Sequence, residues 1–388
     1  MTRRRRLAPI ALVLPLVLLA SACASDAPQD SLDPAGPFAR RIDNLVDPVF
    51  IIAGIVFVLV EVGTVAMVWH FRRRRDEDDD ELPAQIHGNT KLEIGWTVLP
   101  AALLGVIGFF TLVTLFDIDR ADADALTVQV NGQQWWWEYR YDTTGDGRFT
   151  DDDVITAHDM VIPAGRDVTL EINSNDVIHS FWIPRLNGKK DAVPGRTHTL
   201  NIHADEPGTY VGQCTEYCGL SHAYMRQRVI AVEPDEYEAW LDDQMADAEM
   251  PSDPLAAAGA DTFVAQCSTC HLARGINDAE FDRAVVEERL VAGNAPDLTH
   301  FASRGAFAGA TFDLWADTDG DEIVEWEEIG GELNRADLEA WLRNPSEQKP
   351  MHVSLDDYNA GQQVRGMPDF NLSEDQIDEL VAFLETLE

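Results

Sequence analysis

The stretch Cys214-Thr-Glu-Tyr-Cys218-Gly-Leu-Ser-His222-Ala-Tyr-Met225 places two thiols, an imidazole and a thioether within twelve residues. His179 lies 35 positions before Cys214, and a loop between two strands can bring it into the same cluster. Soft sulfur ligands combined with imidazole favour copper over hard cations. One cysteine with two histidines and a methionine would form a mononuclear site, whereas the second cysteine allows two sulfur atoms to bridge two copper ions.

Two other interpretations of this cluster stay open on the residues alone. Cys214, Cys218, His179 and His222 make a two-cysteine, two-histidine set of the kind that holds structural zinc. The two cysteines could instead form a disulfide. Met225 argues against zinc, because a thioether adds nothing for Zn²⁺, so a copper pair is the preferred prediction.

A second redox motif, Cys267-Ser-Thr-Cys270-His271, has the spacing of a covalent haem attachment site. Cys267 and Cys270 would bond the haem vinyl groups, and His271 would be the proximal iron ligand. For the distal ligand we prefer Met367, because Gly-Met-Pro before a terminal amphipathic helix resembles the distal-ligand loop of small class I cytochromes c. Met351 is the second choice. Histidine–methionine ligation gives a potential suited to feeding electrons to copper.

Composition narrows the possible partners. The 388 residues are enough for two or three domains, and 68 acidic against 29 basic residues give a net charge of −39. Such a charge argues against a nucleic-acid partner. It fits either attraction of a basic protein or general solvation. All five cysteines have a chemical role available, so no disulfide framework is needed.

The N-terminal residues predict export. Residues 1–22 have a basic start, an apolar run and a small-residue exit, which is typical of a secretory signal peptide. The exit resembles a bacterial lipoprotein cleavage site, so we expect acylation of Cys23. A polar linker is predicted over residues 23–46.

Residues 47–117 predict a transmembrane hairpin. Apolar stretches at about 48–71 and 96–116 are each long enough to span a bilayer. The loop between them begins with four arginines, residues 72–75, which places it in the cytoplasm. The large C-terminal half therefore lies on the outer side of the membrane, which for a lipoprotein signal is a bacterial cell membrane.

The pattern changes to alternation after the second span. Residues 127–130, 168–172 and 197–202 alternate apolar and polar side chains between turn signals, and 228–232 closes the series. This predicts an antiparallel all-β domain, a sandwich or barrel, over residues 122–234.

The last third of the chain is helical in pattern. Residues 235–256 are expected to be a linker, with a helix up to residue 248 and prolines after it. Residues 257–388 contain amphipathic stretches at 257–265 and 335–343, and a capping box at Ser373 that starts a closing helix. An all-α domain of this size matches a small c-type cytochrome, so the chain is predicted to be multidomain.

The run from Gln213 to Met225, with Asp176 to Pro184 and Gly132 to Tyr139, resembles subunit II of the haem–copper cytochrome c oxidases. The resemblance extends from about Asp47 to Val232 and includes the hairpin. It implies a cupredoxin barrel with a binuclear copper centre called CuA. The implied copper ligands are His179, Cys214, the backbone carbonyl of Glu216, Cys218, His222 and Met225.

The resemblance also implies roles for four other positions. Trp135 falls where the family accepts electrons from cytochrome c, although core packing is the alternative for the whole Trp135–Trp137 triplet. The Glu216 side chain and Asp191 match a magnesium site shared with the catalytic subunit, although Asp191 could be a solvated turn residue. Glu93 matches the mouth of a proton channel, although an acidic residue at the start of a helix is also ordinary.

The predicted function is electron delivery in a respiratory cytochrome c oxidase. Electrons from a soluble cytochrome c or a bc complex would reach the haem, pass to CuA and leave for the haem of a separate catalytic subunit I. There O₂ would be reduced to water with proton pumping. The expected partners are subunit I, other oxidase subunits, the electron donor and the membrane.

Three other protein classes share part of this sequence pattern. Nitrous oxide reductase also uses a CuA domain but adds a large catalytic domain that has no counterpart here. Quinol oxidase subunit II shares the hairpin and barrel but lacks the two thiolates. A copper-storage or copper-delivery lipoprotein needs no electron donor, so the haem motif and the tryptophan triplet disfavour it.

Two acidic loops depart from the family pattern. Residues 142–153 and 317–328 follow the ligand spacing of an EF-hand calcium loop, with Glu322 in place of the usual turn glycine in the second. Calcium binding is one hypothesis for each loop, and simple solvation of an acidic loop is the other.

Overall fold

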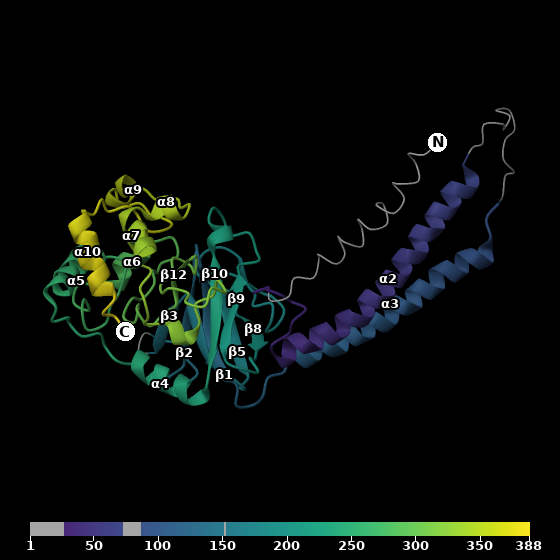
Figure 1. Cartoon of the computed structure of the whole chain (residues 1–388), viewed down its shortest axis with the longest axis horizontal. Helices are drawn as coiled ribbons and strands as arrows, with labels where there is room; N and C mark the ends of the chain where they lie inside the picture. Colours follow the sequence, from purple (N-terminus) through teal and green to yellow (C-terminus); the bar gives the residue numbers. More distant parts are fainter. Residues whose placement is uncertain (1–26, 73–86, 151–152) are drawn as a thin grey trace, which may run out of the picture.

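The computed structural model describes residues 27–72, 87–150 and 153–388. Two long helices, α2 (Pro37–Phe71) and α3 (Thr90–Ile118), lie side by side and project away from the rest of the chain (Figure 1). Both are long and apolar enough to cross a bilayer. They contain the two predicted spans. The predicted signal peptide, Cys23 and most of the arginine loop lie outside the described residues.

Helix α2 begins earlier than the sequence predicted. Gly36 is extended and Pro37 occupies the first turn, where a missing N–H costs nothing. The Ala35 amide donates to the Arg185 carbonyl at 2.8 Å, and Phe38 is only 1% exposed. The predicted polar linker over residues 23–46 is therefore wrong from residue 35 onward, because this segment packs on the β domain and begins α2.

The β domain consists of two main sheets with strand orders β3-β2-β1-β5-β8 and β4-β10-β9. A short ribbon of β6 and β7 pairs separately. The bounds are β1 Leu126–Gln133, β2 Trp136–Tyr141, β3 Val154–Ala157, β4 Asp159–Pro163, β5 Val168–Ser174, β6 His179–Phe181, β7 Lys190–Ala192, β8 His198–Ile202, β9 Gly208–Gln213 and β10 Arg226–Val232. Alternate residues of β5 are buried, which confirms the strand assignment from alternation.

The pairing directions are mixed. Most neighbours are antiparallel as predicted, but β1 pairs with β5 and β4 pairs with β10 in parallel. The purely antiparallel prediction is wrong for these pairs, because alternation fixes which face a side chain occupies and not the direction of the neighbouring strand.

Helix α4 (Pro234–Gln244) also belongs to the β domain. Tyr237 and Trp240 are buried, and the Trp240 ring centroid lies 5.2 Å from that of Tyr141. The first half of the predicted 235–256 linker is therefore part of a packed core, and the helix ends before residue 248.

The C-terminal part contains mostly short helices. Their bounds are α5 Pro254–Gln266, α6 Arg283–Arg289, α7 Arg335–Arg343, α8 Pro345–Gln348, α9 Leu355–Asn359 and α10 Glu374–Leu384. Helices α5 and α10 pack together (Figure 1), with the Phe263 and Phe383 ring centroids 5.3 Å apart. The predicted helices at 257–265 and 335–343 and the capping box at Ser373 are confirmed.

This part is not all-α as predicted. A two-stranded hairpin of β11 (Ala306–Phe307) and β12 (Phe312–Asp313) interrupts the helices. Its turn holds Ala308, Gly309 and Ala310 at positive φ. No periodic pattern predicts such short strands.

Candidate functional site

The structure brings the predicted copper ligands together. Strand β6 begins with His179, and the other side chains come from the loop between β9 and β10. The Cys218 sulfur lies 3.8 Å from the Cys214 sulfur, 3.6 Å from Nδ1 of His222 and 3.8 Å from Sδ of Met225. Nδ1 of His179 lies 3.9 Å from the Cys214 sulfur.

The donor set fits a copper pair. The Glu216 carbonyl oxygen lies 3.3 Å from the Cys214 sulfur, as a backbone ligand requires. Cys214 and Cys218 are free thiols, so the disulfide alternative is not formed. The fully buried Met225 thioether faces these thiols, and thioether sulfur is a ligand for copper and not for zinc.

Neighbouring polar groups prepare these ligands. Asp176 Oδ1 lies 2.8 Å from Nε2 of His179, which leaves Nδ1 to face Cys214. Burial lowers the pKa of His179, but the hydrogen bonds and charges of Asp176 and Cys214 together outweigh burial and raise the pKa overall. The hydrogen bond between the two thiols lowers the pKa of Cys214 below its ordinary range, and the same hydrogen bond, together with burial, raises the pKa of Cys218. One thiolate therefore forms readily.

Trp135 directly contacts the loop between β9 and β10, residues 214–225, which we call the copper loop after its proposed ligands. Its Nε1 donates to the Cys218 carbonyl at 3.2 Å, and Nε2 of Gln134 donates to the same oxygen at 2.6 Å. Trp135 is 3% exposed. Trp137 is fully buried, and its ring centroid lies 5.9 Å from that of His179. The core-packing alternative therefore describes Trp137. Trp135, in contrast, also lines a cavity.

That cavity lies between the β domain and the C-terminal domain. It is lined mainly by apolar side chains, which is the environment that a haem macrocycle needs. The β domain contributes Trp135 and Trp136, and the C-terminal domain contributes the predicted haem-binding side chains. These are Cys267, Cys270, His271, Met351 and Met367.

The local geometry at His271 fits a proximal ligand. Its Nδ1 lies 2.8 Å from the Pro296 carbonyl, which leaves Nε2 free to bind iron. Burial lowers the pKa of His271, so the imidazole stays neutral as a ligand must. Burial also raises the pKa of Cys267 to about 12 and of Cys270 to about 11.

Both candidate distal methionines line the cavity. Met367 packs with the core of the helical domain, whereas Met351 packs against the core of the β domain. Gly366 has φ of +112°, and a Cβ there would collide with Met351. The two loops are therefore in contact, and the choice of Met367 stays a prediction.

Two predicted site residues, Asp191 and Glu93, lie outside the cluster of proposed copper ligands. Asp191 on β7 pairs with Ser180 on β6, one position from His179 along that strand. Glu93 is exposed in the first turn of α3, which Asn89 caps through the Lys91 and Leu92 amides. The magnesium role of Asp191 with Glu216 and the proton-channel role of Glu93 stay predictions.

The second acidic loop is folded compactly. Carboxylate oxygens of Asp317, Asp319 and Asp321 lie within 4.8 Å of one another. Glu322, at the position of the usual glycine, has φ of +71°. In the first loop Asp153 accepts the Thr143 amide at 3.0 Å, and residues 151 and 152 lie outside the described part. Calcium binding at either loop stays a prediction.

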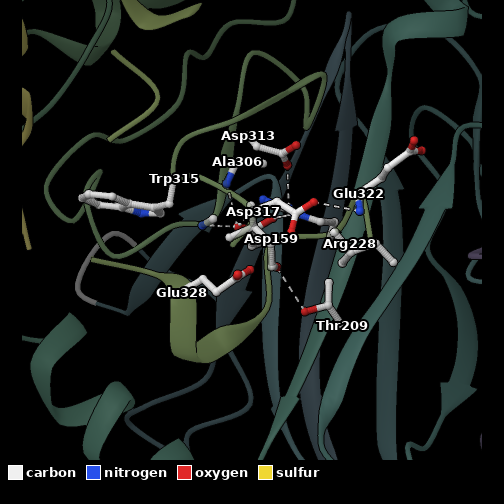
Figure 2. A network of polar contacts seen from close by, with 12 residues as sticks. Asp159, Thr209, Arg228, Ala306, Asp313, Trp315, Asp317, Glu322 and Glu328 are labelled. Carbon is white, nitrogen blue, oxygen red and sulfur yellow. Dashed lines mark hydrogen bonds and ion pairs between the residues drawn. The ribbon is translucent and has the colours of Figure 1, made fainter. Parts of the chain in front are cut away.

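Three buried charged residues between the domains, Asp159, Arg228 and Lys349, were not predicted as functional from the sequence. Asp159 and Arg228 are buried opposite each other on β4 and β10 and form an ion pair, with Arg228 Nε 2.8 Å from the Asp159 carboxylate (Figure 2). Lys349 is 3% exposed, and burial lowers its pKa to about 7. An arginine within a strand whose other residues are mostly buried, Arg226–Val232, was the available signal.

Comparison with known proteins identifies the family. The family "Cytochrome C oxidase subunit II, periplasmic domain" matches residues 126–232, and "Cytochrome C oxidase subunit II, transmembrane domain" matches residues 27–114. Cytochrome c oxidase subunit 2 of Alkalihalophilus pseudofirmus is 34% identical over 96% of this chain and 94% of its own length. Cytochrome c oxidase subunit 2 of a Bacillus species is 30% identical over 82% of this chain and 80% of its own length.

A solved structure is also similar. The periplasmic domain of subunit II of cytochrome oxidase of Bradyrhizobium japonicum is 29% identical, with a TM-score of 0.29, over 32% of this chain and 94% of that domain. The two apolar helices and the match to an outer domain describe a membrane-anchored protein. The chain belongs to the cytochrome c oxidase subunit II family, and its activity is that of an oxidoreductase complex.

Proposed function

We propose that this chain carries both a binuclear copper centre and a covalent haem c, and that it passes electrons from cytochrome c to the catalytic subunit of the oxidase. The copper ligands would be His179, Cys214, the Glu216 carbonyl, Cys218, His222 and Met225. When bound, the two groups supply reversible one-electron chemistry. The chain's own residues hold them, orient them and exclude water.

The observation that carries this proposal is the position of Trp135. Its indole donates to the carbonyl of the proposed copper ligand Cys218. The same side chain lines the cavity that contains Cys267, Cys270 and His271. One buried aromatic residue therefore lies between the proposed copper-binding loop and the candidate haem cavity, which supports Trp135 as the electron-accepting residue of the copper domain.

The C-terminal domain has support beyond the haem motif. The similarity to the Alkalihalophilus pseudofirmus subunit covers 96% of the chain, so it includes this domain. His271 is held by the Pro296 carbonyl with its other ring nitrogen available for iron. A copper-storage or copper-delivery role would not use such a cavity beside Trp135.

The remaining roles belong to the assembled oxidase. We propose that the outer domains face the periplasmic or extracellular side of a bacterial cell membrane, with Cys23 acylated after signal cleavage. Asp191 and the Glu216 side chain would bind magnesium at the interface with subunit I, and Glu93 would lie at the mouth of a proton channel. O₂ reduction and proton pumping would take place in subunit I.

Spectra of the purified full-length chain test the proposal. We expect low-spin haem c and an electron paramagnetic resonance signal in which one unpaired electron is shared by two copper nuclei. Metal analysis should give two copper atoms for each haem iron. A signal from a single copper nucleus, or bound zinc, would refute the binuclear assignment.

The distal ligand needs a paired test. Met367→Ala should abolish the methionine-to-iron absorption band in the red, whereas Met351→Ala should retain it. Both side chains line the same cavity, so each variant is the matched control for the other. If only Met351→Ala loses the band, then Met351 is the distal ligand.

A further inference from the structure

The β11–β12 hairpin is one part of the C-terminal domain that reaches the copper loop; the Pro350 carbonyl, which accepts from Ser221, is another. Phe307, Ala308 and Gly309 line the haem cavity. The Gly309 carbonyl accepts the Arg226 amide at 2.9 Å, and Thr311 Oγ1 donates to the Tyr224 carbonyl at 2.7 Å. Tyr224 and Arg226 flank the proposed copper ligand Met225, so this hairpin lies between the two candidate centres.

A buried ion pair holds the base of the hairpin (Figure 2). The Asp159 carboxylate accepts the backbone amides of Gly305 at 2.7 Å and Ala306 at 3.1 Å, as well as Nε of Arg228 at 2.8 Å. Nη1 of Arg228 donates to Asp313 on the second strand at 3.0 Å. Asp159 is 2% exposed and Arg228 4%, so the contacts of Asp159 form out of water, where unpaired groups are costly, whereas the Asp313 side chain is 46% exposed.

A buried lysine holds the tip. Nζ of Lys349 donates to the Trp135 carbonyl at 2.6 Å and to the Ala308 carbonyl at 2.8 Å. The first carbonyl belongs to the β domain and the second to the hairpin turn. The ammonium group therefore ties the backbone of the proposed electron-accepting residue to the wall of the haem cavity.

Glycine permits this close approach. Gly309 has φ of +78°, and a Cβ there would collide with the Trp135 carbonyl and Nζ of Lys349. A Cβ on Gly305 would lie 2.8 Å from Nη2 of Arg228. The hairpin backbone is thus pressed against the β domain at both its base and its tip.

We propose that the β11–β12 hairpin is a positioning element that fixes the haem cavity against Trp135 and the copper loop, with Asp159, Arg228 and Lys349 as its positioning residues. Domains joined only by a connecting segment move relative to one another by default. The clamped hairpin restricts that freedom, together with the Thr209–Glu325 and Ser221–Pro350 contacts, so one electron would pass from the haem iron to the copper pair without a separate docking step. The inference rests on the proposed haem and copper centres.

A matched pair of glycine variants tests this role in the full-length protein. Gly309→Ala introduces a collision with the β domain, whereas Gly330→Ala, at φ of +82° with no atom within 4 Å of its Cβ, carries the same backbone cost in open space. Gly309→Ala should raise the hydrogen-exchange rate of the Arg226 amide by about tenfold. It should also slow haem-to-copper transfer after photochemical injection of one electron, with optical and paramagnetic spectra and reduction potentials unchanged. Gly330→Ala should change none of these.

Lys349→Met supplies a second variant if Gly309→Ala does not fold. It keeps a long apolar stem and removes both hydrogen bonds, so it should slow the same transfer step. If the wild-type protein contains both centres but the folded variants transfer electrons at the wild-type rate, the positioning role alone is overturned. A wild-type protein without covalent haem or paired copper would overturn the proposed function itself, and the electron-transfer role of the hairpin with it.

Discussion

Cys214 and Cys218 lie with their sulfur atoms 3.8 Å apart among polar partners, whereas Cys267 and Cys270 line an apolar cavity. In the first pair, hydrogen bonding lowers the pKa of Cys214, which favours a thiolate. In the second pair, burial raises the pKa of both thiols. The two pairs therefore differ in their surroundings, and the proposed roles follow that difference: the pair with a lowered pKa is proposed to bind metal as a thiolate, and the buried pair to form thioether bonds.

The largest expected effect comes from removing one metal-binding sulfur. Cys218→Ser should eliminate the shared-electron copper signal and abolish oxidase turnover, because the second bridging ligand is lost. The haem spectrum should stay intact, because the cavity does not depend on this thiol. Copper analysis and optical spectra of the same sample measure both. Retention of two copper atoms per chain would contradict the ligand assignment.

The complementary change addresses the other pair. The double variant Cys267→Ser with Cys270→Ser should retain copper, but its haem should be extractable into acidic organic solvent because no thioether bond holds it. Thr269→Ser, between the two cysteines, is the control and should keep covalent haem. If the double variant still holds haem through denaturation, the motif is not the attachment site.

A smaller effect is expected from Asp176, which does not bind the metal itself but is hydrogen-bonded to the proposed copper ligand His179. Asp176→Asn removes the charge that orients and supports His179. Loss of such a partner typically lowers metal affinity by about 10- to 100-fold. Competition with a copper chelator would measure the change, with Asp242→Asn on the exposed face of α4 as control. Equal affinities in the two variants would show that Asp176 has no part in the site.

The smallest effect concerns pH. In haem-loaded, copper-free protein the free thiols among the described residues are Cys214 and Cys218. An ordinary thiol loses reactivity toward an alkylating reagent by about tenfold per pH unit below its pKa. Because the pKa of Cys214 is lowered, its thiolate persists as the pH falls from 8 to 6, so the alkylation rate should fall much less steeply. A tenfold fall per unit would mean that the pair has no preformed thiolate.

The sequence predicted the cluster of proposed copper ligands because their residue types and spacing are chemically specific. His179 and Met225 converge on the two thiols as expected. Helix 335–343 and strand β5 were predictable because periodicity reports burial directly. The helix and the strand are set by local sequence, and the ligand cluster depends on one loop and one neighbouring strand.

What the sequence did not predict is how the domains meet. The contact of Lys349 with the Trp135 carbonyl joins residues 214 positions apart, and no periodic pattern encodes it. The left-handed turn at Ala308 to Ala310 is made by residues with no turn preference except Gly309. The alternation of apolar and polar residues also did not predict the parallel pairing of β4 with β10, which places Asp159 opposite Arg228.

Helix α2 starts on the β domain and not at the membrane, with Phe38 packed beneath it. Its 35 residues span about 52 Å at 1.5 Å per residue, well beyond the roughly 30 Å of a hydrocarbon core. The remaining length of α2 extends out of the bilayer toward the β domain. The extra length of α2 therefore separates the β domain, with its proposed copper site, from the lipid surface.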